Sequence, residues 1–86
     1  MVSVRRDKMN DNIHIMIGKE LVLLRIENGL SIENIVDKTK LNKDTLYRYE
    51  KGRGNNFNTL AKILSAYNIN FYIFFRRIYD RLQNED

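Results

Sequence analysis

The chain has 86 residues, a formal net charge of +4, 43% apolar residues and no cysteine. This length supports one hydrophobic core and therefore one domain, and without cysteine neither disulfides nor thiolate–metal sites can hold the fold. No apolar run reaches the roughly 18–20 residues needed to cross a bilayer, and the first residues lack the apolar stretch of a signal peptide, so we expect a cytoplasmic protein without a membrane partner.

The first predicted element is a helix with one apolar residue on each turn: Ile13, Ile17, Leu21 and Leu24. We expect it to end near Asn28, because Gly29 can adopt the left-handed conformation that closes a helix. Residues 1–11 show no such stripe. We predict that they form a flexible segment ahead of a single domain at residues 12–86, and Met9 is an alternative start.

Two short helices are expected next, in a unit that runs from about Ser31 to Gly52. Ser31 is a natural N-cap for a helix at residues 32–38 and Asn42 for one at residues 43–51, because each side chain can accept from a free backbone N–H. The residues placed to pack between the two helices are Ile35, Leu41, Leu46 and Tyr49. The outer side of the second helix is left with Lys43, Asp44, Tyr47, Arg48 and Lys51.

This spacing is compatible with a helix-turn-helix, whose second helix enters the DNA major groove. Residues 38–53 hold six basic residues against two acidic ones, a net charge of +4 that equals the charge of the whole chain. The concentration of positive charge favours a polyanionic partner. An ordinary helical hairpin with a solvated, charged face would show the same pattern.

Two more helices are predicted after a loop at residues 53–57. Asn58 is expected to cap the fourth at residues 59–67, and Asn68 and Asn70 bracket a break before the fifth at residues 71–83. One side of the fifth helix carries Phe71, Phe74, Phe75, Ile78 and Leu82. Since no alternating stretch supports a strand, the fold class that we predict is all-α, a compact bundle of five helices.

The combined pattern resembles the Cro/phage-repressor (XRE-type) helix-turn-helix family of DNA-binding transcriptional regulators. Its opening is matched by IGKEL at residues 17–21, LR at 24–25 and GLSIENI at 29–35, and its recognition-helix half by LNKDTLYRYEKG at 41–52. Leu60, Ile63 and the break at residues 67–69 match the fourth helix and its exit. The resemblance covers about residues 17–75 and implies a lambda-repressor-like DNA-binding fold, with the second and third helices forming the helix-turn-helix.

Four positions depart from the family pattern. Ile32 stands where the family has a glutamine that often touches a phosphate, and Val36 replaces the small alanine at the close approach of the two helices. Lys40 replaces the glycine of the tight turn, and a left-handed conformation there would cost about 1 kcal/mol. Asn56 takes the place of a common proline.

The resemblance also implies which residues contact DNA. Base contacts are expected from Lys43, Asp44, Thr45, Tyr47 and Arg48. Phosphate contacts are expected from Asn42, Lys51, Arg53, Asn55, Asn56 and Asn58. The chemistry is suitable, because lysine and arginine donate to guanine O6 and N7 and aspartate accepts from cytosine N4. An ion pair between Arg25 and Glu50 is expected to fix the angle of the recognition helix.

The fifth helix carries more apolar surface than one core face needs, because Tyr72, Ile73 and Tyr79 lie outside its main stripe. We therefore expect a homodimer, whose interface comprises Phe71, Tyr72, Ile73, Phe75 and Tyr79. Two alternatives stay open. The tyrosines could merely cover the core edge, or the aromatics with Arg76, Arg77 and Arg81 could rest on a membrane surface.

The function predicted from these features is that of a transcriptional regulator, a repressor that binds an inverted-repeat operator in double-stranded DNA. An enzyme finds little support, because the chain has one histidine, no cysteine, and a Gly52-x-Gly54 pair too short for a phosphate cradle. No cofactor or metal is expected. An antitoxin that binds a toxin and represses its own operon, and a restriction–modification controller protein, are alternatives, and RNA polymerase is a further conceivable partner.

Overall fold

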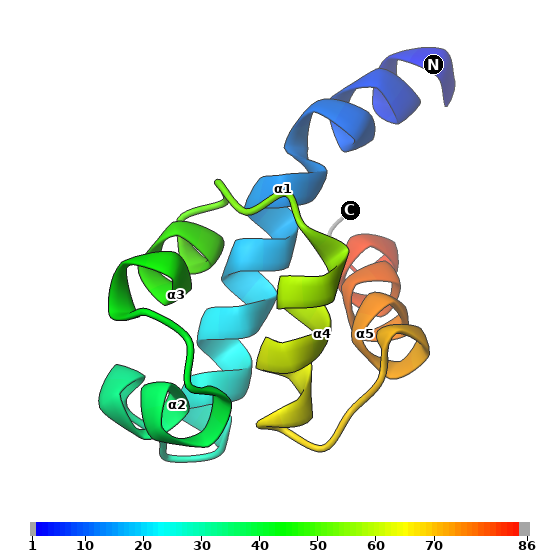
Figure 1. The fold of residues 1–86 in the computed structure, drawn as a ribbon. Helices are drawn as coiled ribbons and strands as arrows, with labels where there is room; N and C mark the ends of the chain where they lie inside the picture. Colours follow the sequence, from blue (N-terminus) through cyan, green and yellow to red (C-terminus); the bar gives the residue numbers. More distant parts are fainter. Residues whose placement is uncertain (1, 85–86) are drawn as a thin grey trace.

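The computed structural model describes the backbone of residues 2–84 and the side chains of residues 13–84. Five α-helices and no strand occur in this part of the chain (Figure 1). The helices are α1 (Val2–Glu27), α2 (Ile32–Thr39), α3 (Lys43–Glu50), α4 (Phe57–Ser65) and α5 (Phe71–Gln83). The predicted all-α, five-helix fold is confirmed.

Helix α1 is the central element of the bundle. In Figure 1 it runs between α3 on one side and α5 on the other, while α4 lies between α3 and α5. Of its four expected apolar residues, Ile17, Leu21 and Leu24 are buried and Ile13 is half-buried. The helix begins at Val2, well before the first residue of the apolar stripe, Ile13. The segment ahead of Ile13 has no apolar stripe that would indicate a helix. The flexibility of residues 1–11 stays a prediction.

The hydrophobic core receives one apolar face from each helix. Representative buried residues, one from each helix in chain order, are Leu21, Ile35, Leu46, Leu64 and Phe74. Full burial of a side chain of this size contributes about 1.5–3 kcal/mol. The shared core therefore stabilises α2, α3 and α4, which have only eight or nine residues each and would be marginal as isolated helices.

The helix ends around the second and third helices follow the local signals in the sequence. Ser31 accepts from the Asn34 N–H at 3.1 Å while the Asn34 side chain accepts from the Ser31 N–H at 2.9 Å, which makes a reciprocal capping box. Asn42 accepts from the Asp44 N–H at 2.7 Å. Gly29 has a φ of 64° and closes α1 in the left-handed conformation, as predicted.

The start of α4 differs from the prediction. Its cap is Asn56, whose Oδ1 accepts from the Thr59 N–H at 3.0 Å, and Asn58 lies within the helix. Asn56 is the cap because of a contact with a residue outside α4. The Tyr49 hydroxyl donates to the Asn56 carbonyl and accepts from the Asn56 N–H, both at 2.9 Å, and so fixes the backbone at that residue. The helix also ends earlier than expected, at Ser65 rather than Tyr67.

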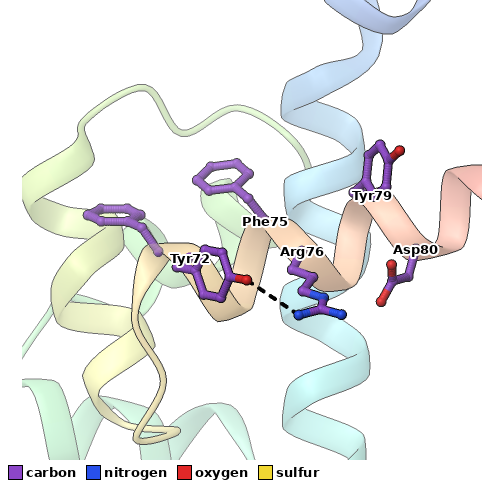
Figure 2. Close-up of a pocket in the computed structure, with 6 residues that line it drawn as sticks. Tyr72, Phe75, Arg76, Tyr79 and Asp80 are labelled. Carbon is purple, nitrogen blue, oxygen red and sulfur yellow. Dashed lines mark hydrogen bonds between the residues drawn. The ribbon is translucent and has the colours of Figure 1, made fainter.

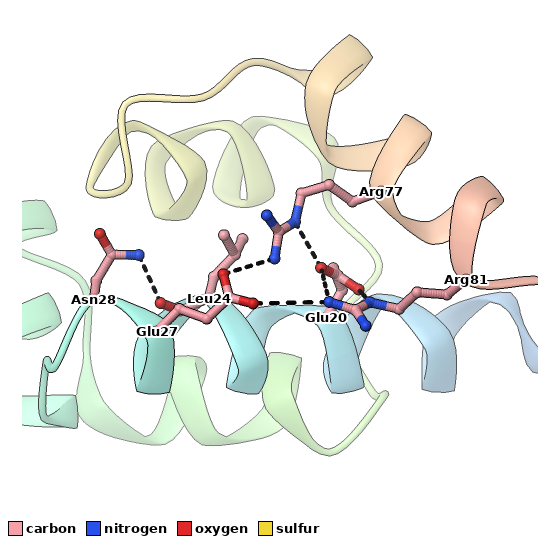
Figure 3. Close-up of polar contacts among 6 residues, drawn as sticks. All are labelled: Glu20, Leu24, Glu27, Asn28, Arg77 and Arg81. Atoms are coloured by element: carbon pink, nitrogen blue, oxygen red, sulfur yellow. Dashed lines mark hydrogen bonds and ion pairs between the residues drawn. The ribbon is translucent and has the colours of Figure 1, made fainter. Parts of the chain in front are cut away.

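A buried carboxylate joins α5 to α1 (Figure 3). Glu20 is 1% exposed and accepts from Arg77 Nε at 2.7 Å and from Arg81 Nε. Arg77 Nη2 also donates to Glu27 at 2.8 Å. Two guanidinium groups thus compensate the desolvation of one carboxylate. Because Arg77 and Arg81 are paired with carboxylates of α1, they support the membrane-surface alternative less than the sequence suggested. Within the described range no helix has the length and apolar character of a membrane span.

Candidate nucleic-acid interface

Helices α2 and α3 are joined by a tight turn at residues 40–42. Lys40 has a φ of 63°, and its N–H donates to the Val36 carbonyl at 2.7 Å, which closes α2. The Thr39 hydroxyl then accepts from the Leu41 N–H at 3.2 Å. A lysine in the left-handed conformation costs about 1 kcal/mol relative to glycine, so the turn keeps the shape expected from the family pattern at a small loss of stability.

The two sides of α3 differ in the way the sequence predicts. Leu46 and Tyr49 are buried and Ile35 of α2 packs in the same core, whereas Leu41 is half-buried. Four residues expected to contact bases are exposed: Lys43, Asp44, Tyr47 and Arg48. Thr45, the fifth, is half-buried. The exposed side of α3 therefore presents donors and an acceptor on one rigid element.

Lys43 has a partner that sequence reasoning missed. Its Nζ donates to the Glu33 carboxylate at 2.8 Å and lies 5.9 Å from the centre of the Tyr47 ring. The hydrogen bond to Glu33 raises the pKa of Lys43, and the same bond lowers the pKa of Glu33. Nothing local in the sequence indicates this pair, because it depends on how α2 and α3 cross.

The residues expected to contact phosphates surround this side of α3. Asn42 stands at its N-terminal end, and Lys51, Arg53 and Asn55 follow its C-terminal end, all of them exposed. Asn56 and Asn58 lie at the start of α4. The carbonyl oxygens of the Asn42 and Asn56 side chains already accept capping hydrogen bonds. That engagement leaves the amide NH2 group of each as a donor, the polarity that a phosphate oxygen requires.

The C-terminal end of α3 is held against α1 by two restraints. Arg25 donates to Glu50 through Nε at 2.8 Å and through Nη2 at 3.1 Å, so the expected ion pair is present and bidentate. The hydrogen bond to Glu50 raises the pKa of Arg25. About two turns earlier on the same face of α1, a Cβ placed on Gly18 would lie 2.5 Å from the Glu50 carbonyl oxygen. Only glycine permits this approach of the two backbones.

A mostly apolar surface lies on α5, across α1 from α3 (Figures 1 and 2). Its exposed side chains include Tyr72 and Tyr79, 66% and 57% exposed, while Phe75 is half-buried. Figure 2 shows that Tyr72, Phe75 and Tyr79 border an open hollow together with Arg76, whose Nη1 donates to the Tyr72 hydroxyl at 3.3 Å. We call Phe71, Tyr72, Ile73, Phe75 and Tyr79 the α5 surface; Ile73 is exposed but does not line the hollow.

Phe57, which sequence reasoning did not select, extends the α5 surface. It is 70% exposed, and its ring packs edge-to-face on Phe71 at a centroid distance of 6.0 Å. Phe71 in turn stacks on Phe75 at 6.1 Å. The aromatic row thus continues from α5 to the first residue of α4.

Among the residues with described side chains, no three His, Cys, Asp or Glu gather in a way that could hold a metal ion.

Comparison with known proteins agrees with this geometry. The sequence profile of the Cro/C1-type HTH DNA-binding domain matches residues 20–72, which reach from α1 to the first turn of α5. The crystal structure of a point mutant of the restriction-modification controller protein C.Esp1396I superimposes with a TM-score of 0.73. It shares 18% sequence identity, over 84% of this chain and 92% of that chain, a likeness of fold. No curated protein sequence matches the chain.

Proposed function

The chain belongs to the Cro/C1-type helix-turn-helix DNA-binding family, and from this we propose that it is a transcriptional regulator, a repressor that binds an inverted-repeat operator as a homodimer. The observation that carries the proposal is the outer side of α3, where Lys43, Asp44, Tyr47 and Arg48 are exposed together on a helix held rigidly against α1. A recognition helix needs both properties, accessible side chains and a fixed angle to the groove.

In this proposal α3 enters the major groove. Arg48 and Lys43 donate to guanine O6 and N7, and Asp44 accepts from cytosine N4. Tyr47 and the half-buried Thr45 lie beside them and contact neighbouring base edges. These side chains distinguish one base pair from another, because each base pair presents a different set of donors and acceptors in the major groove.

The flanking residues hold α3 in place on the duplex. Lys51 and Arg53 neutralise phosphates beyond the C-terminal end of α3, and the amide groups of Asn42, Asn55, Asn56 and Asn58 donate to phosphate oxygens. Such contacts supply affinity and register without reading sequence. They also release counterions, so binding is expected to weaken as the salt concentration rises.

The α5 surface is the proposed homodimer contact. It lies across α1 from α3, so pairing two copies through it leaves both recognition helices uncovered. A two-fold dimer matches an inverted repeat, with half-site centres about 34 Å, one helical turn, apart. Two linked half-sites also bind far more tightly than one.

A restriction–modification controller protein is the second candidate, favoured over an antitoxin by the fold shared with such a controller over most of both chains. Both candidates use the same DNA-binding surface. A restriction–modification gene pair beside this gene supports the controller, whereas a small toxin gene supports the antitoxin. We propose no enzymatic activity and no cofactor for either, since the site consists of side chains suited to binding DNA.

Selection from a pool of random-sequence duplex DNA tests the proposed function. The protein is expected to enrich one inverted repeat over several rounds, relative to the sequenced unselected pool. A variant with Lys43, Arg48 and Lys51 replaced by alanine serves as the matched control and should enrich no sequence while keeping its helix content. If the wild-type protein also enriches none, the proposed function is wrong.

A further inference from the structure

The ion pair between Lys43 and Glu33 lies at the edge of the proposed reading surface. Lys43 is the first residue of α3, and Glu33 lies in the first turn of α2, where a negative charge favours the positive end of the helix dipole. The two side chains are 51% and 66% exposed, and the Nζ–Oε2 distance is 2.8 Å. A carboxylate thus sits beside one of the lysines that we place in the groove.

This pairing has different consequences for the two ways in which the protein meets DNA. Binding to DNA of arbitrary sequence depends on cations that neutralise phosphates. Lys43 and Glu33 together carry no net charge, so the pair adds little to that term, and the carboxylate repels phosphates. An ammonium group, however, has three N–H donors. One can stay on Glu33 while the others donate to guanine O6 and N7.

We propose that Glu33 is a specificity-determining residue, which holds Lys43 so that this ammonium group contributes to binding of the operator more than to binding of other DNA. The inference rests on the proposed function, since it concerns the same recognition helix. The Tyr47 ring, 5.9 Å from Lys43 Nζ, further restricts the lysine to the exposed side of α3.

The experiment compares Glu33→Gln with the wild-type protein on two duplexes over a range of salt concentrations. One duplex is the site that the wild-type protein selects, and the other is a scrambled sequence of equal length and composition. At low salt, Glu33→Gln should bind the scrambled duplex at least about three times more tightly than the wild-type protein does. The salt slope, the slope of log binding constant against log salt concentration, should be steeper by about one unit per half-site. Affinity for the selected site should rise less, so the ratio of the two affinities falls.

Two controls separate release of Lys43 from a simple change of net charge. Asp37→Asn removes the same charge from an exposed position of the same helix, and Asp37 forms no ion pair with any residue whose side chain is described. It should leave the ratio unchanged. In a Lys43→Ala background, Glu33→Gln should have no more effect than Asp37→Asn. Circular dichroism checks that each variant keeps its helices.

The inference is overturned by any of three results. In the first, Glu33→Gln leaves the ratio of affinities for the selected and scrambled duplexes at its wild-type value. In the second, Asp37→Asn lowers this ratio as much as Glu33→Gln does. In the third, Glu33→Gln lowers the ratio as much in the Lys43→Ala background as in the wild-type protein. Failure of the proposed function is distinguishable from these results, because the wild-type protein would then show no preference for the selected duplex over the scrambled one.

Discussion

The Arg25 guanidinium group and the Glu50 carboxylate form a bidentate ion pair, with N–O distances of 2.8 and 3.1 Å, that joins α1 to the last residue of α3. Both side chains are largely shielded from water, with 22% and 12% exposed. A pair with this geometry has a defined orientation, unlike most exposed ion pairs, which contribute about 0–1 kcal/mol. It is the side-chain contact best placed to set the angle of the recognition helix.

Replacing Glu50 with Gln should weaken operator binding by about 1–2 kcal/mol while leaving helix content nearly unchanged, because a neutral amide cannot receive both charged donors of Arg25. Affinity is measured on the selected site, and helix content by circular dichroism. Glu27→Gln, which alters a contact to α5 and not to α3, is the control and should retain operator affinity. Unchanged affinity of Glu50→Gln would mean that the pair does not orient α3.

Replacing Lys40 with Gly should raise the free energy of unfolding by about 0.5–1 kcal/mol, since the left-handed conformation strains a lysine and not a glycine. Urea unfolding measures the change. The same substitution at Lys38, which lies in α2, should lower the free energy of unfolding by about 0.5–1 kcal/mol. A Lys40→Gly variant no more stable than the wild-type protein would show that the turn is unstrained.

Tyr67 is expected to make the protein less stable in alkali. Burial of the phenol, with a further contribution from the Glu50 charge, raises the pKa of Tyr67 from 10.0 to about 12. Between these values the unfolded chain loses the phenol proton and the folded protein keeps it, so stability falls as pH rises. At about pH 11 this titration lowers the free energy of unfolding by about 1 kcal/mol. Below the unfolded-state pKa of 10.0 the phenol is protonated in both states, and the free energy of unfolding no longer changes with Tyr67.

Tyr67→Phe removes this titration while keeping the ring. Urea unfolding of both proteins at about pH 9 and about pH 11 should show that the wild-type protein loses about 1 kcal/mol more than the variant. The variant corrects for other groups that titrate in alkali. Equal losses in the two proteins would show that the Tyr67 pKa is the same in the folded and unfolded states.

The features that the sequence predicts well are those decided within a few residues. The bounds of α2, α3 and α5 lie within about one residue of prediction, the usual uncertainty of a helix end, because Ser31, Asn42 and Asn70 cap the turns that follow them. The side of α3 that is exposed also follows from the helical spacing of its apolar residues. These local signals, with the family resemblance, were sufficient for the fold and for the position of the candidate interface.

The features that the sequence does not predict depend on the relative placement of distant helices. Asn56 and Asn58 are equally good caps by residue type, and the hydroxyl of Tyr49 decides between them. Glu20 and Arg77 meet only because α5 packs on α1 in one register. The contact between Phe57 and Phe71 has the same origin. No spacing rule for a single helix reports such pairs.

The α5 surface is expected to form a homodimer. Sedimentation at micromolar concentration should give about twice the chain mass for the wild-type protein, and Tyr72→Glu or Tyr79→Glu should give the single-chain mass, because a charge would be buried at the contact. Ile26→Glu places the same charge at an exposed residue of α1 and should preserve the dimer. A wild-type protein that stays monomeric with and without DNA would contradict the prediction.

Arg48 and Arg53 should differ in what they contact, since Arg48 lies within α3 and Arg53 follows its end. Arg53→Ala should weaken binding to every sequence alike and lower the salt slope by about one unit per half-site. Arg48→Ala should cost about 1–3 kcal/mol on the selected site and relax preference at one base pair of each half-site.

The deciding measurement is the affinity of Arg48→Ala for a panel of duplexes, each with a single base pair of the selected site changed. If α3 reads base edges, the variant should lose discrimination at one position of each half-site and keep it at the others. If Arg48→Ala instead lowers affinity evenly across the whole panel, Arg48 is a phosphate contact and the exposed side of α3 is not the reading surface.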